Sequence, residues 1–378
     1  EITRFDTDGF RVRMACEAEF EPEDFMDRRL ARRSDLMSQL ALVAARLAVE
    51  DAGLLRPDER ASLRQGVIFA SGGGGAALRE EQHAVYLDRG ADRVNPFTIP
   101  HTIVNTPAAL IAAEFGLRGP NFSTTTACAA GSDAIGVAAE TILRGEADVM
   151  IAGGSDALVT PLFVAGFDAM RVLSRRNDEP DRAARPFDRD RDGFLIGEGG
   201  AALVLETRDR ARERGAAVIC EIAGYGASAD AHHPTDPDPS GVSQGRAIRA
   251  CLDSAGIAPA EVGYVSTHGG GSQPGDPAEI AAIVGALGAD VAARTPVSAT
   301  KSMHGHCMGG TGALEAVLTG LAVHEGVLPP TINLEHVAEG CDAVTHIAGE
   351  ARPESVDYAL STSFGLGGQN TVLCLARD

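Results

Sequence analysis

Cys128 lies in the segment STTTACAAGSDAIG, where a Thr-rich strand end turns through small residues into a predicted helix. A cysteine attacks as its thiolate, and with an ordinary pKa of about 8.5 only a few per cent is ionised at pH 7. The free amides and dipole of a helix N-terminus favour the thiolate, and the small neighbours leave room for a substrate. We therefore interpret Cys128 as a nucleophile, whereas Cys220, Cys251 and Cys374 fit the commoner case of an inert buried cysteine.

Two histidines each follow a predicted strand, His268 in VSTHGGGSQPGDPAE and His306 in ATKSMHGHCMGGTGALEAV. Ligands gather at the carboxyl ends of strands in open α/β sheets, so Cys128, His268 and His306 are expected to converge. The adjacent glycines permit close approach of the backbone. A lone loop histidine is more often merely solvated, but two at strand ends favour a functional interpretation.

Lys301 is the single lysine among 33 basic residues. The richness in Ala, Gly and Arg indicates a GC-rich genome in which lysine codons have become rare, so chance survival of one lysine is the alternative. Arginine does not replace a compact ammonium where geometry is tight. We therefore predict that Lys301, five residues before His306, is required.

The composition excludes several classes of protein. The chain has 378 residues, 44% of them hydrophobic, and a net charge of −20, which disfavours non-specific binding to nucleic acid or to an anionic membrane. No apolar run reaches the length of about 18 residues that a transmembrane helix needs. Seven cysteines without CxxC spacing argue against a disulfide framework or zinc cluster. We expect a soluble cytoplasmic protein.

Three patterns resemble metal or phosphate sites and fail. Residues 188–193 begin like a calcium loop, but its twelfth position is Gly199 and Glu198 arrives one residue early. The HxHC run at 304–307 lacks a second ligand cluster, and the glycines at 72–75 lack a following GK[ST]. We expect no metal site.

Segments with helical spacing alternate with short apolar runs. Residues 34–53 predict a helix that begins at the capping residue Ser34 and ends at Gly53. Its buried face is expected to contain Leu36, Leu40, Val43 and Leu47. Apolar runs predict strands at 66–71, 148–154, 201–206, 263–267 and 371–376. This alternation indicates an α/β fold.

The two halves of the chain also resemble each other. GVIFASGGGG resembles GYVSTHGGGS, and CAAGSDA resembles CMGGTGA, in the same order. Glycine-rich similarity arises easily, but the preserved order favours a duplicated α/β unit with a join at 207–217. We predict one half at 1–210 with Cys128, and a second at 211–378 with His268, Lys301 and His306.

Together these segments resemble the β-ketoacyl-acyl carrier protein synthases, the condensing enzymes of the thiolase superfamily. TACAAG resembles the nucleophile segment, HGGGSQPGDPAE the first histidine segment, and TKSMHGHCMGGTGALEA the lysine and second histidine segment. SFGLGGQN resembles the closing glycine-rich loop, and RPFDRDRDGFLIGEG, the calcium-like segment, matches a further family motif. The resemblance covers nearly the whole chain and implies a thiolase-like duplicated fold layered α-β-α-β-α.

One cysteine with two histidines resembles the elongating, carrier-protein-dependent branch, and differs from the Cys, His and Asn group and from thiolases. The resemblance implies decarboxylative condensation of an acyl chain with malonyl-acyl carrier protein. The catalytic ketosynthase subunit of type II polyketide systems is slightly favoured by the GC-rich composition and the altered His268 loop. Fatty-acid elongating synthase II is the alternative. A non-catalytic chain-length subunit is a remote one, because such subunits typically lack the nucleophile.

The resemblance implies a role for each matched residue. Cys128 accepts the acyl chain, while His268 and His306 promote decarboxylation of the malonyl thioester and stabilise the enolate. Lys301 orients the histidines. The other implied assignments are Glu315 as partner of Lys301, Asp276 and Glu279 as supports, the amides of Cys128 and Phe364 as oxyanion hole, Phe364 as gate of the acyl pocket, and Gly270 and Ser272 at the two positions that usually grip phosphopantetheine with hydroxyls.

The implied partners are an acyl carrier protein and an identical or related second subunit, and no bound cofactor is implied. Carrier proteins are acidic, so docking needs a basic face. The candidates are Arg28, Arg29, Arg32 and Arg33, with Arg171, Arg175 and Arg176 as a second group. An ordinary solvated charge run is the alternative. The chain also begins inside the family pattern, without the usual first strand and helix, so we expect it to be part of a longer protein.

Overall fold

The first of two sheets contains four strands in the order β2-β1-β3-β4. The computed structural model describes residues 1–32, 34–54 and 58–378. The strands of this sheet are β1 (Gln65–Ala70), β2 (Asn121–Phe122), β3 (Val149–Ala157) and β4 (Glu198–Glu206). The first three are parallel and β4 is antiparallel to β3. Every residue of β1 and β3 is buried, as expected for strands covered on both faces.

The second sheet contains six strands in the order β5-β12-β11-β6-β7-β9. These are β5 (Glu221–Ala229), β6 (Val262–Ser266), β7 (Pro296–Ser298), β9 (Thr345–His346), β11 (Tyr358–Gly365) and β12 (Gln369–Ala376). A separate ribbon pairs β8 (Val327–Leu328) with β10 (Arg352–Pro353). All five predicted strands are therefore present, with ends shifted by up to three residues.

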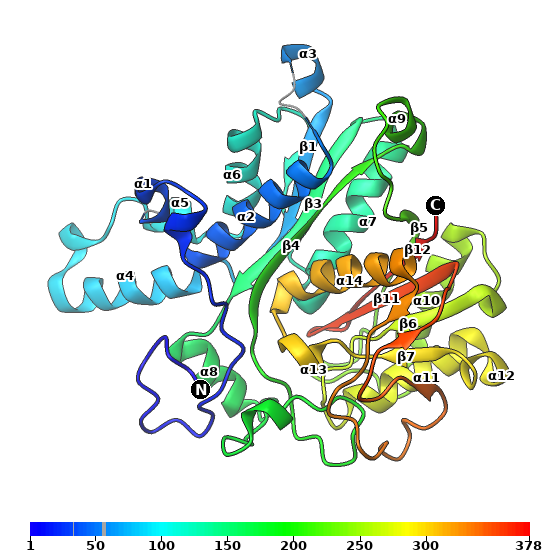
Figure 1. Cartoon of the computed structure of the whole chain (residues 1–378). Coiled ribbons are helices and arrows are strands. Elements are labelled where there is room, and N and C mark those ends of the chain that lie inside the picture. Colours follow the sequence, from blue (N-terminus) through cyan, green and yellow to red (C-terminus); the bar gives the residue numbers. More distant parts are fainter. Residues whose placement is uncertain (33, 55–57) are drawn as a thin grey trace.

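Helices lie between the two sheets and outside them (Figure 1). The longer helices are α2 (Leu36–Asp51), α4 (Ala76–Arg89), α6 (Thr106–Phe115), α7 (Ala130–Leu143), α8 (Pro161–Ala169), α10 (Val242–Ala255), α11 (Gly275–Leu287) and α14 (Thr311–Glu325). The shorter ones are α1 (Arg28–Ala31), α3 (Glu59–Ser62), α5 (Thr98–Thr102), α9 (Arg208–Glu213), α12 (Ala289–Ala292) and α13 (Lys301–His304).

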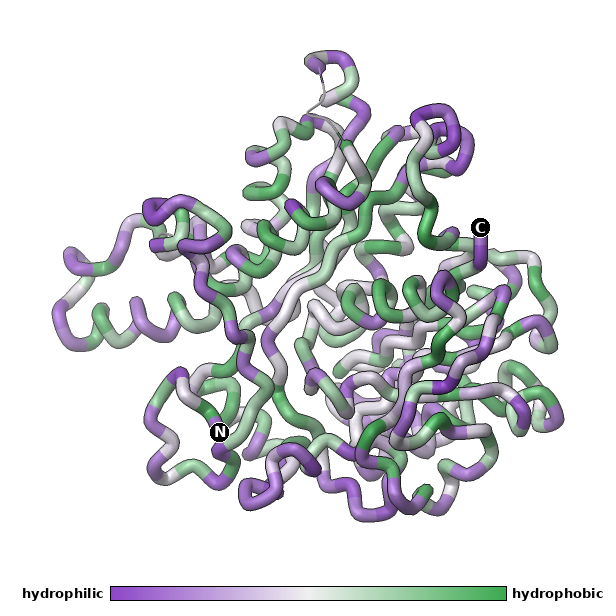
Figure 2. The backbone as a smooth tube through the Cα atoms, in the orientation of Figure 1, coloured by the Kyte–Doolittle hydropathy of each residue, from purple (hydrophilic) through white to green (hydrophobic). Residues whose placement is uncertain are grey.

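The helices and sheets form five layers. Helices α7 and α14 contact each other and both sheets, so they form the central layer. Helices α2 and α6 pack on the outside of the first sheet, and α10 packs on the second beside α11. Figure 2 shows apolar segments concentrated along the sheets and the helices around them. The predicted α-β-α-β-α arrangement is confirmed.

The two sheets share one strand pattern. The order β2-β1-β3-β4 matches β7-β6-β11-β12, with three parallel strands and an antiparallel fourth in both. A 3₁₀ turn with positive φ at its first residue precedes each central helix: η3 at Ala127–Ala129 (φ 50° at Ala127) and η6 at Met308–Gly310 (φ 46° at Met308). Ala127 is thus structurally equivalent to Met308. The similarity between CAAGSDA and CMGGTGA instead aligns Cys128 with Cys307, so the structural alignment differs from the sequence alignment by two residues. The boundary at 210/211 stays a prediction.

The central helices cross at a pair of glycines. A Cβ at Gly131 would lie 2.5 Å from the amide nitrogen of Ala313, and a Cβ at Gly312 would lie 2.5 Å from the hydroxyl of Ser132. Real Cβ atoms do not approach this closely, so both positions require glycine. The reciprocal contacts bring the starts of α7 and α14 side by side.

Helix α2 differs in detail from the prediction for residues 34–53. Its N-cap is Asp35, whose carboxylate accepts the Met37 N–H at 3.0 Å, while the Ser34 hydroxyl donates to the preceding α1 turn. Val43 is buried as predicted, but Leu36 and Leu40 are only partly buried and Leu47 is 57% exposed. Small residues allow the helix to approach the sheet closely, and the buried face includes Met37, Ala41, Leu42 and Ala45.

Candidate active site

Cys128 lies in the η3 turn that leads into α7. Ala127 before it adopts a positive φ of 50°, a conformation that costs a non-glycine residue about 1–2 kcal/mol. The end of β11 packs closely against this turn, because a Cβ at Gly365 would lie 3.2 Å from the Cys128 nitrogen. The turn therefore holds Cys128 in a fixed position, with the residue 8% exposed.

A cavity of about 330 Å³ brings most of the predicted residues together, while Lys301 and Glu315 are not part of its lining. Its lining includes Cys128, His268, His306, Phe364, Asp276 and Glu279, together with Gly270 and Ser272. Residues more than 100 positions apart in the sequence therefore share one site, because the turns after β6 and before α7 and α14 all open into it.

The proton position on His268 follows from its contact with Lys301. The Lys301 ammonium lies 3.4 Å from His268 Nδ1 and can only donate, so Nδ1 accepts and the neutral ring carries its proton on Nε2. Burial lowers the pKa of His268 well below its ordinary value, and the neighbouring Lys301 and His306 lower it further. His268 is therefore neutral at pH 7, with an Nε2–H available as a donor.

His306 is held through its other ring nitrogen. Its Nδ1 lies 2.9 Å from the Thr311 hydroxyl, which can donate or accept. Its Nε2 is buried without a hydrogen-bond partner in the described part of the chain. Burial, with Lys301 and His304, lowers the pKa of His306 well below its ordinary value. The ring is edge-on to His268, with centroids 5.4 Å apart. The site thus contains the neutral imidazole of His306, whose Nε2 has no hydrogen-bond partner among the described residues.

Lys301 connects both histidine segments to α14. Its ammonium donates to the Glu315 carboxylate at 2.6 Å and to the His268 carbonyl at 2.5 Å, and the residue is 2% exposed. Burial raises the pKa of Glu315 to about 7 against the opposing effect of Lys301. The predicted pairing of Lys301 with Glu315 is present, and it fixes the ammonium beside the His268 ring.

Glu279 and Asp276 of α11 hold the loop that carries His268. Glu279 accepts the backbone N–H groups of His268 and Gly269 at 2.7 and 2.8 Å. Asp276 accepts the Gly271 N–H at 3.0 Å and lies 3.4 Å from Arg191. Burial raises the pKa of Glu279 to about 7 and that of Asp276 to about 6, although these hydrogen bonds oppose the shift. Both residues therefore shape the loop, as expected for supports.

Asp156 at the end of β3 has an equivalent role that the sequence analysis missed. This buried carboxylate accepts the N–H groups of Gly72 at 2.8 Å and Gly309 at 2.7 Å, and the Ser71 hydroxyl at 2.7 Å. Burial raises its pKa to about 6 despite these bonds. It joins the glycine loop after β1 to the η6 turn after His306. The polar Ser-Asp pair that ends an apolar strand was the available signal.

The expectation of a lowered Cys128 pKa is wrong for this site. Burial raises the pKa of the thiol, and this effect exceeds those of the Leu366 N–H and the Lys301 ammonium, which lower it. The start of the central helix α7 lies between two sheets and away from water. Burial therefore raises the thiol pKa by more than the helix N-terminus can lower it. Cys128 rests as a thiol, and attack requires a base that accepts its proton.

The loops around the cavity mouth clarify three other predicted positions. The Ser272 hydroxyl accepts the Gly275 N–H at 2.9 Å at the start of α11, so this contact occupies it within the fold. A Cβ at Gly270 would lie 3.7 Å from His268 Nε2, in otherwise open space. The centroid of the Phe364 ring lies 6.2 Å from that of the His268 ring, and Phe364 lines the cavity together with Cys128.

The proposed docking arginines differ in their surroundings. Arg28, Arg29 and Arg32 are exposed and do not line the cavity, and Arg33 lies outside the described residues. In the second group, Arg175 pairs with Asp168 at 2.6 Å and Arg176 lies 3.8 Å from Asp192. Arg171 lines the cavity, and no carboxylate within residues 1–32, 34–54 and 58–378 forms an ion pair with it.

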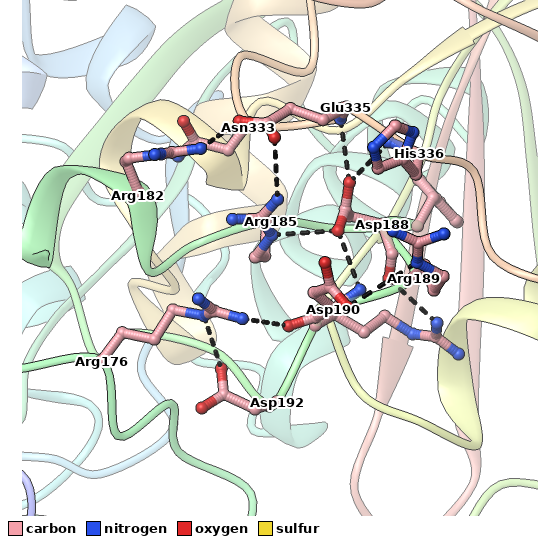
Figure 3. A network of polar contacts seen from close by, with 12 residues as sticks. Arg176, Arg182, Arg185, Asp188, Arg189, Asp190, Asp192, Asn333, Glu335 and His336 are labelled. Carbon is pink, nitrogen blue, oxygen red and sulfur yellow. Dashed lines mark hydrogen bonds and ion pairs between the residues drawn. The ribbon is translucent and has the colours of Figure 1, made fainter.

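The calcium-like segment is a structural clamp (Figure 3). Asp188 is fully buried and accepts the N–H groups of Glu335 and His336 at 2.8 and 2.9 Å, and Arg185 Nε at 3.0 Å. Burial tends to raise its pKa, but these donors together lower it to about 2. Its oxygens are thus occupied by protein donors. In the described part of the chain, no three His, Cys, Asp or Glu residues are grouped to hold a metal ion.

We expect Asp188→Asn to lower the free energy of unfolding by at least about 2 kcal/mol at pH 7. A folded pKa below the ordinary 3.8 stabilises the protein above pH 4, and this contribution is lost as the pH falls towards 2. Urea unfolding at pH 7 and pH 3 should show the difference from wild type shrinking by about 1 kcal/mol. Asp190→Asn, at a half-exposed neighbour, is the control, and a pH-independent difference would contradict the assignment.

Comparison with known proteins places these features in a family. The family models for the β-ketoacyl synthase N-terminal and C-terminal domains match residues 7–211 and 219–335. Proteins named 3-oxoacyl-[acyl-carrier-protein] synthase 2 from Coxiella burnetii and Synechocystis are 43% and 44% identical over 377 residues, covering 100% of this chain and 90% of theirs.

Solved structures agree with this relationship. The ishigamide ketosynthase/chain length factor has a TM-score of 0.90 and 36% identity, over 100% of this chain and 91% of that chain. A type II polyketide acyl carrier protein in complex with its ketosynthase bound to the hexaketide has a TM-score of 0.86 and 33% identity, over 90% and 85%. The chain with its buried cysteine and two neutral histidines therefore belongs to the β-ketoacyl synthase family.

Proposed function

We propose that the protein catalyses decarboxylative condensation of a Cys128-bound acyl chain with a malonyl group on acyl carrier protein. The observation that carries the proposal is one cavity shared by Cys128 and two neutral histidines: His268, with its proton on Nε2, and His306, whose Nε2 has no hydrogen-bond partner among the described residues. Both acyl groups arrive as thioesters, so the reaction as written needs no bound cofactor. The family relationship gives the class of enzyme, and the catalytic roles of these three residues are part of our proposal.

The first half-reaction is acyl transfer to Cys128. His306 Nε2 accepts the thiol proton while Nδ1–H donates to Thr311, and the thiolate attacks the carrier thioester. The carrier thiolate leaves and takes the proton from His306. The amides of Cys128 and Phe364 are proposed to stabilise the oxyanion, with each such donor contributing about 3 kcal/mol.

The second half-reaction is decarboxylation and carbon–carbon bond formation. Carbon dioxide leaves the malonyl thioester, and its bonding electrons form an enolate whose oxygen accepts the His268 Nε2–H. The Thr311 hydroxyl can also donate to His306 Nδ1, which leaves His306 Nε2 protonated as a second donor. The enolate carbon attacks the Cys128 thioester, and the Cys128 thiolate leaves and takes a proton from water, which restores the resting thiol.

Intact mass measurement tests the proposal directly. Incubation with acyl-carrier protein should add one acyl group to Cys128, and later addition of malonyl-carrier protein should discharge it as a β-ketoacyl product. A wild-type protein that gained no acyl group would refute the catalytic proposal and favour the non-catalytic subunit.

The two candidate pathways share this reaction and differ in the fate of the β-ketoacyl product. The relatives named 3-oxoacyl synthase 2 support fatty-acid elongation, while the ketosynthase structures support the type II polyketide pathway that we favour from the sequence. Without a ketoreductase, a polyketide ketosynthase should extend its own β-keto product again. A fatty-acid synthase should stop after one condensation.

A second subunit is proposed to cover the α4 segment. Helix α4 projects from the sheets at the left of Figure 1 and buries only Ala76 and Gln82 of its 14 residues. Tyr86 and Leu87 are 50% and 70% exposed, and Ile99 in the neighbouring α5 is 68% exposed. A helix with so little burial needs a partner to be stable. Light scattering should report a dimer, either of this chain or with a related one.

The setting that we propose is the cytoplasm, where seven free thiols fit reducing conditions. In the part of the chain that the structure describes, no helix has the length and apolarity to cross a bilayer.

Carrier docking is proposed to involve cations near the cavity mouth and on α1. We expect Arg171→Glu to raise the KM for carrier-bound substrate about tenfold at low salt, because the variant repels an acidic carrier protein that arginine attracts. The effect should be smaller at high salt, because salt screens the interaction between exposed charges. The combined Arg28→Glu, Arg29→Glu, Arg32→Glu and Arg33→Glu variant tests the α1 group in the same assay. Arg144→Glu, at the opposite end of α7 from Cys128, is the control. An unchanged KM in both variants would move docking elsewhere.

A further inference from the structure

Asp133 is a buried carboxylate in the first turn of α7 and is 6% exposed. One oxygen, Oδ1, accepts the Tyr225 hydroxyl at 2.8 Å and the Thr371 hydroxyl at 2.6 Å. The other, Oδ2, accepts the Thr126 hydroxyl in a short hydrogen bond. Three hydroxyls from β5, β12 and the approach to Cys128 therefore converge on one carboxylate that does not line the cavity.

The two oxygens connect to different parts of the fold. Oδ1 joins α7 to the second sheet through two donors, so the loss of either donor leaves the other in place. Oδ2 has Thr126 as its donor, and Thr126 stands two residues before Cys128. Asp133 thus connects a rigid helix and sheet to the turn that carries the nucleophile.

This turn needs an external restraint. Ala127, between Thr126 and Cys128, has a φ of 50°, which is unfavourable for a residue with a Cβ. Within the turn, the Thr126 carbonyl accepts the Ala129 N–H at 3.0 Å. The Thr124 hydroxyl donates to the Ala130 carbonyl at 2.8 Å and forms a second connection to α7. A strained turn persists only where its surroundings fix it.

We propose that Asp133, acting through Thr126, is a positioning residue that holds the Cys128 turn in the conformation required for acyl transfer. The inference rests on the proposed function of Cys128 as the acyl acceptor. Decarboxylation depends on His268, Lys301 and His306, which are positioned by Glu279, Glu315 and Thr311. The Asp133 contact should therefore affect the first half-reaction and spare the second.

The test compares two isosteric substitutions that each remove one hydroxyl from Asp133. Thr126→Val empties Oδ2, whereas Thr371→Val leaves Oδ1 bonded to Tyr225. We expect Thr126→Val to slow Cys128 acylation at saturating acyl-carrier protein by about tenfold or more, since small misplacement of a reacting group is costly. Thr371→Val should stay within about twofold of wild type, and Thr126→Ser, which keeps the hydroxyl, should restore the rate.

A second readout separates positioning from general loss of structure. In a Cys128→Gln background, Thr126→Val should release carbon dioxide from malonyl-carrier protein within about twofold of the parent. If Thr126→Val acylates as fast as Thr371→Val, or if acylation and decarboxylation fall together, the proposal is wrong. Should Thr126→Val fail to fold, Thr126→Ala removes the same hydroxyl with less bulk and is judged by the same outcomes.

The rate of Cys128 alkylation tests this inference separately from the proposed function, because alkylation needs no acyl transfer. If the wild type accepts no acyl group, the proposed function fails, but the rate of Cys128 alkylation by iodoacetamide still reports the turn. We expect that rate to change at least about threefold in Thr126→Val and not in Thr371→Val. Equal alkylation rates in the two variants would overturn the inference.

Discussion

Cys128→Gln is expected to release carbon dioxide from malonyl-carrier protein while forming no carbon–carbon bond. The amide carbonyl stands where the thioester carbonyl of the acylated enzyme would lie, so the variant resembles the acylated state without a sulfur nucleophile. We expect condensation to fall by a factor on the order of 10⁵, the scale of losing a nucleophile. Decarboxylation should persist because His268 and His306 remain in place.

The histidines are tested in the same background. His268→Ala or His306→Ala added to Cys128→Gln should reduce the residual carbon dioxide release by about 10²-fold or more, as for the loss of an oxyanion donor. His324→Ala is the matched control, because His324 bonds to the Ile219 carbonyl and does not line the cavity. Normal condensation by Cys128→Gln, or decarboxylation indifferent to both histidines, would contradict the proposed mechanism.

Lys301→Arg is expected to reduce decarboxylation by about 10²- to 10³-fold while leaving Cys128 acylation largely intact. The Lys301 ammonium reaches Glu315 and the carbonyl and ring of His268 within 2.5–3.4 Å in a space that excludes water. A planar guanidinium is larger and directs its donors differently, so it cannot satisfy the same three acceptors. Near-normal turnover would show that the lysine is incidental.

A double variant separates the electrostatic and orienting roles of Lys301. Lys301→Met alone leaves Glu315 buried without its cation, which destabilises proteins by about 3–5 kcal/mol. Lys301→Met combined with Glu315→Gln removes both charges and should recover much of this stability. It should not recover decarboxylation, because no donor then orients His268. Recovery of both would assign Lys301 a purely structural role.

The sequence predicted the residues of the site better than it predicted how they are held. His268 and His306 could be found because strand ends and glycine turns leave local patterns, and Cys128 because a helix start follows it. Their convergence followed from the α/β interpretation. The family models then matched residues 7–211 and 219–335, the two ranges in which these three residues lie.

The remaining features depend on contacts between distant segments. Asp156 and Asp133 were missed because a single carboxylate gains its role from donors far away in the sequence, such as Gly309 and Thr371. The thiol pKa of Cys128 was misjudged because the sequence does not show how deeply a helix start is buried. Three of the four residues predicted for the buried face of α2 were misjudged, because the small residues Ala41 and Ala45 take part in the packing where the sequence suggested Leu36, Leu40 and Leu47.

Gly131 and Gly312 make the two halves of the chain depend on each other for the packing of their central helices. A Cβ added at Gly131 or Gly312 would lie 2.5 Å from an atom of the other central helix, so neither position accepts a side chain while the helices cross here. If the halves arose by duplication, the central helix of each copy now packs directly against the central helix of the other. A substitution beside either glycine then alters the fit of both halves, so changes at the two helix starts should have coupled effects on stability.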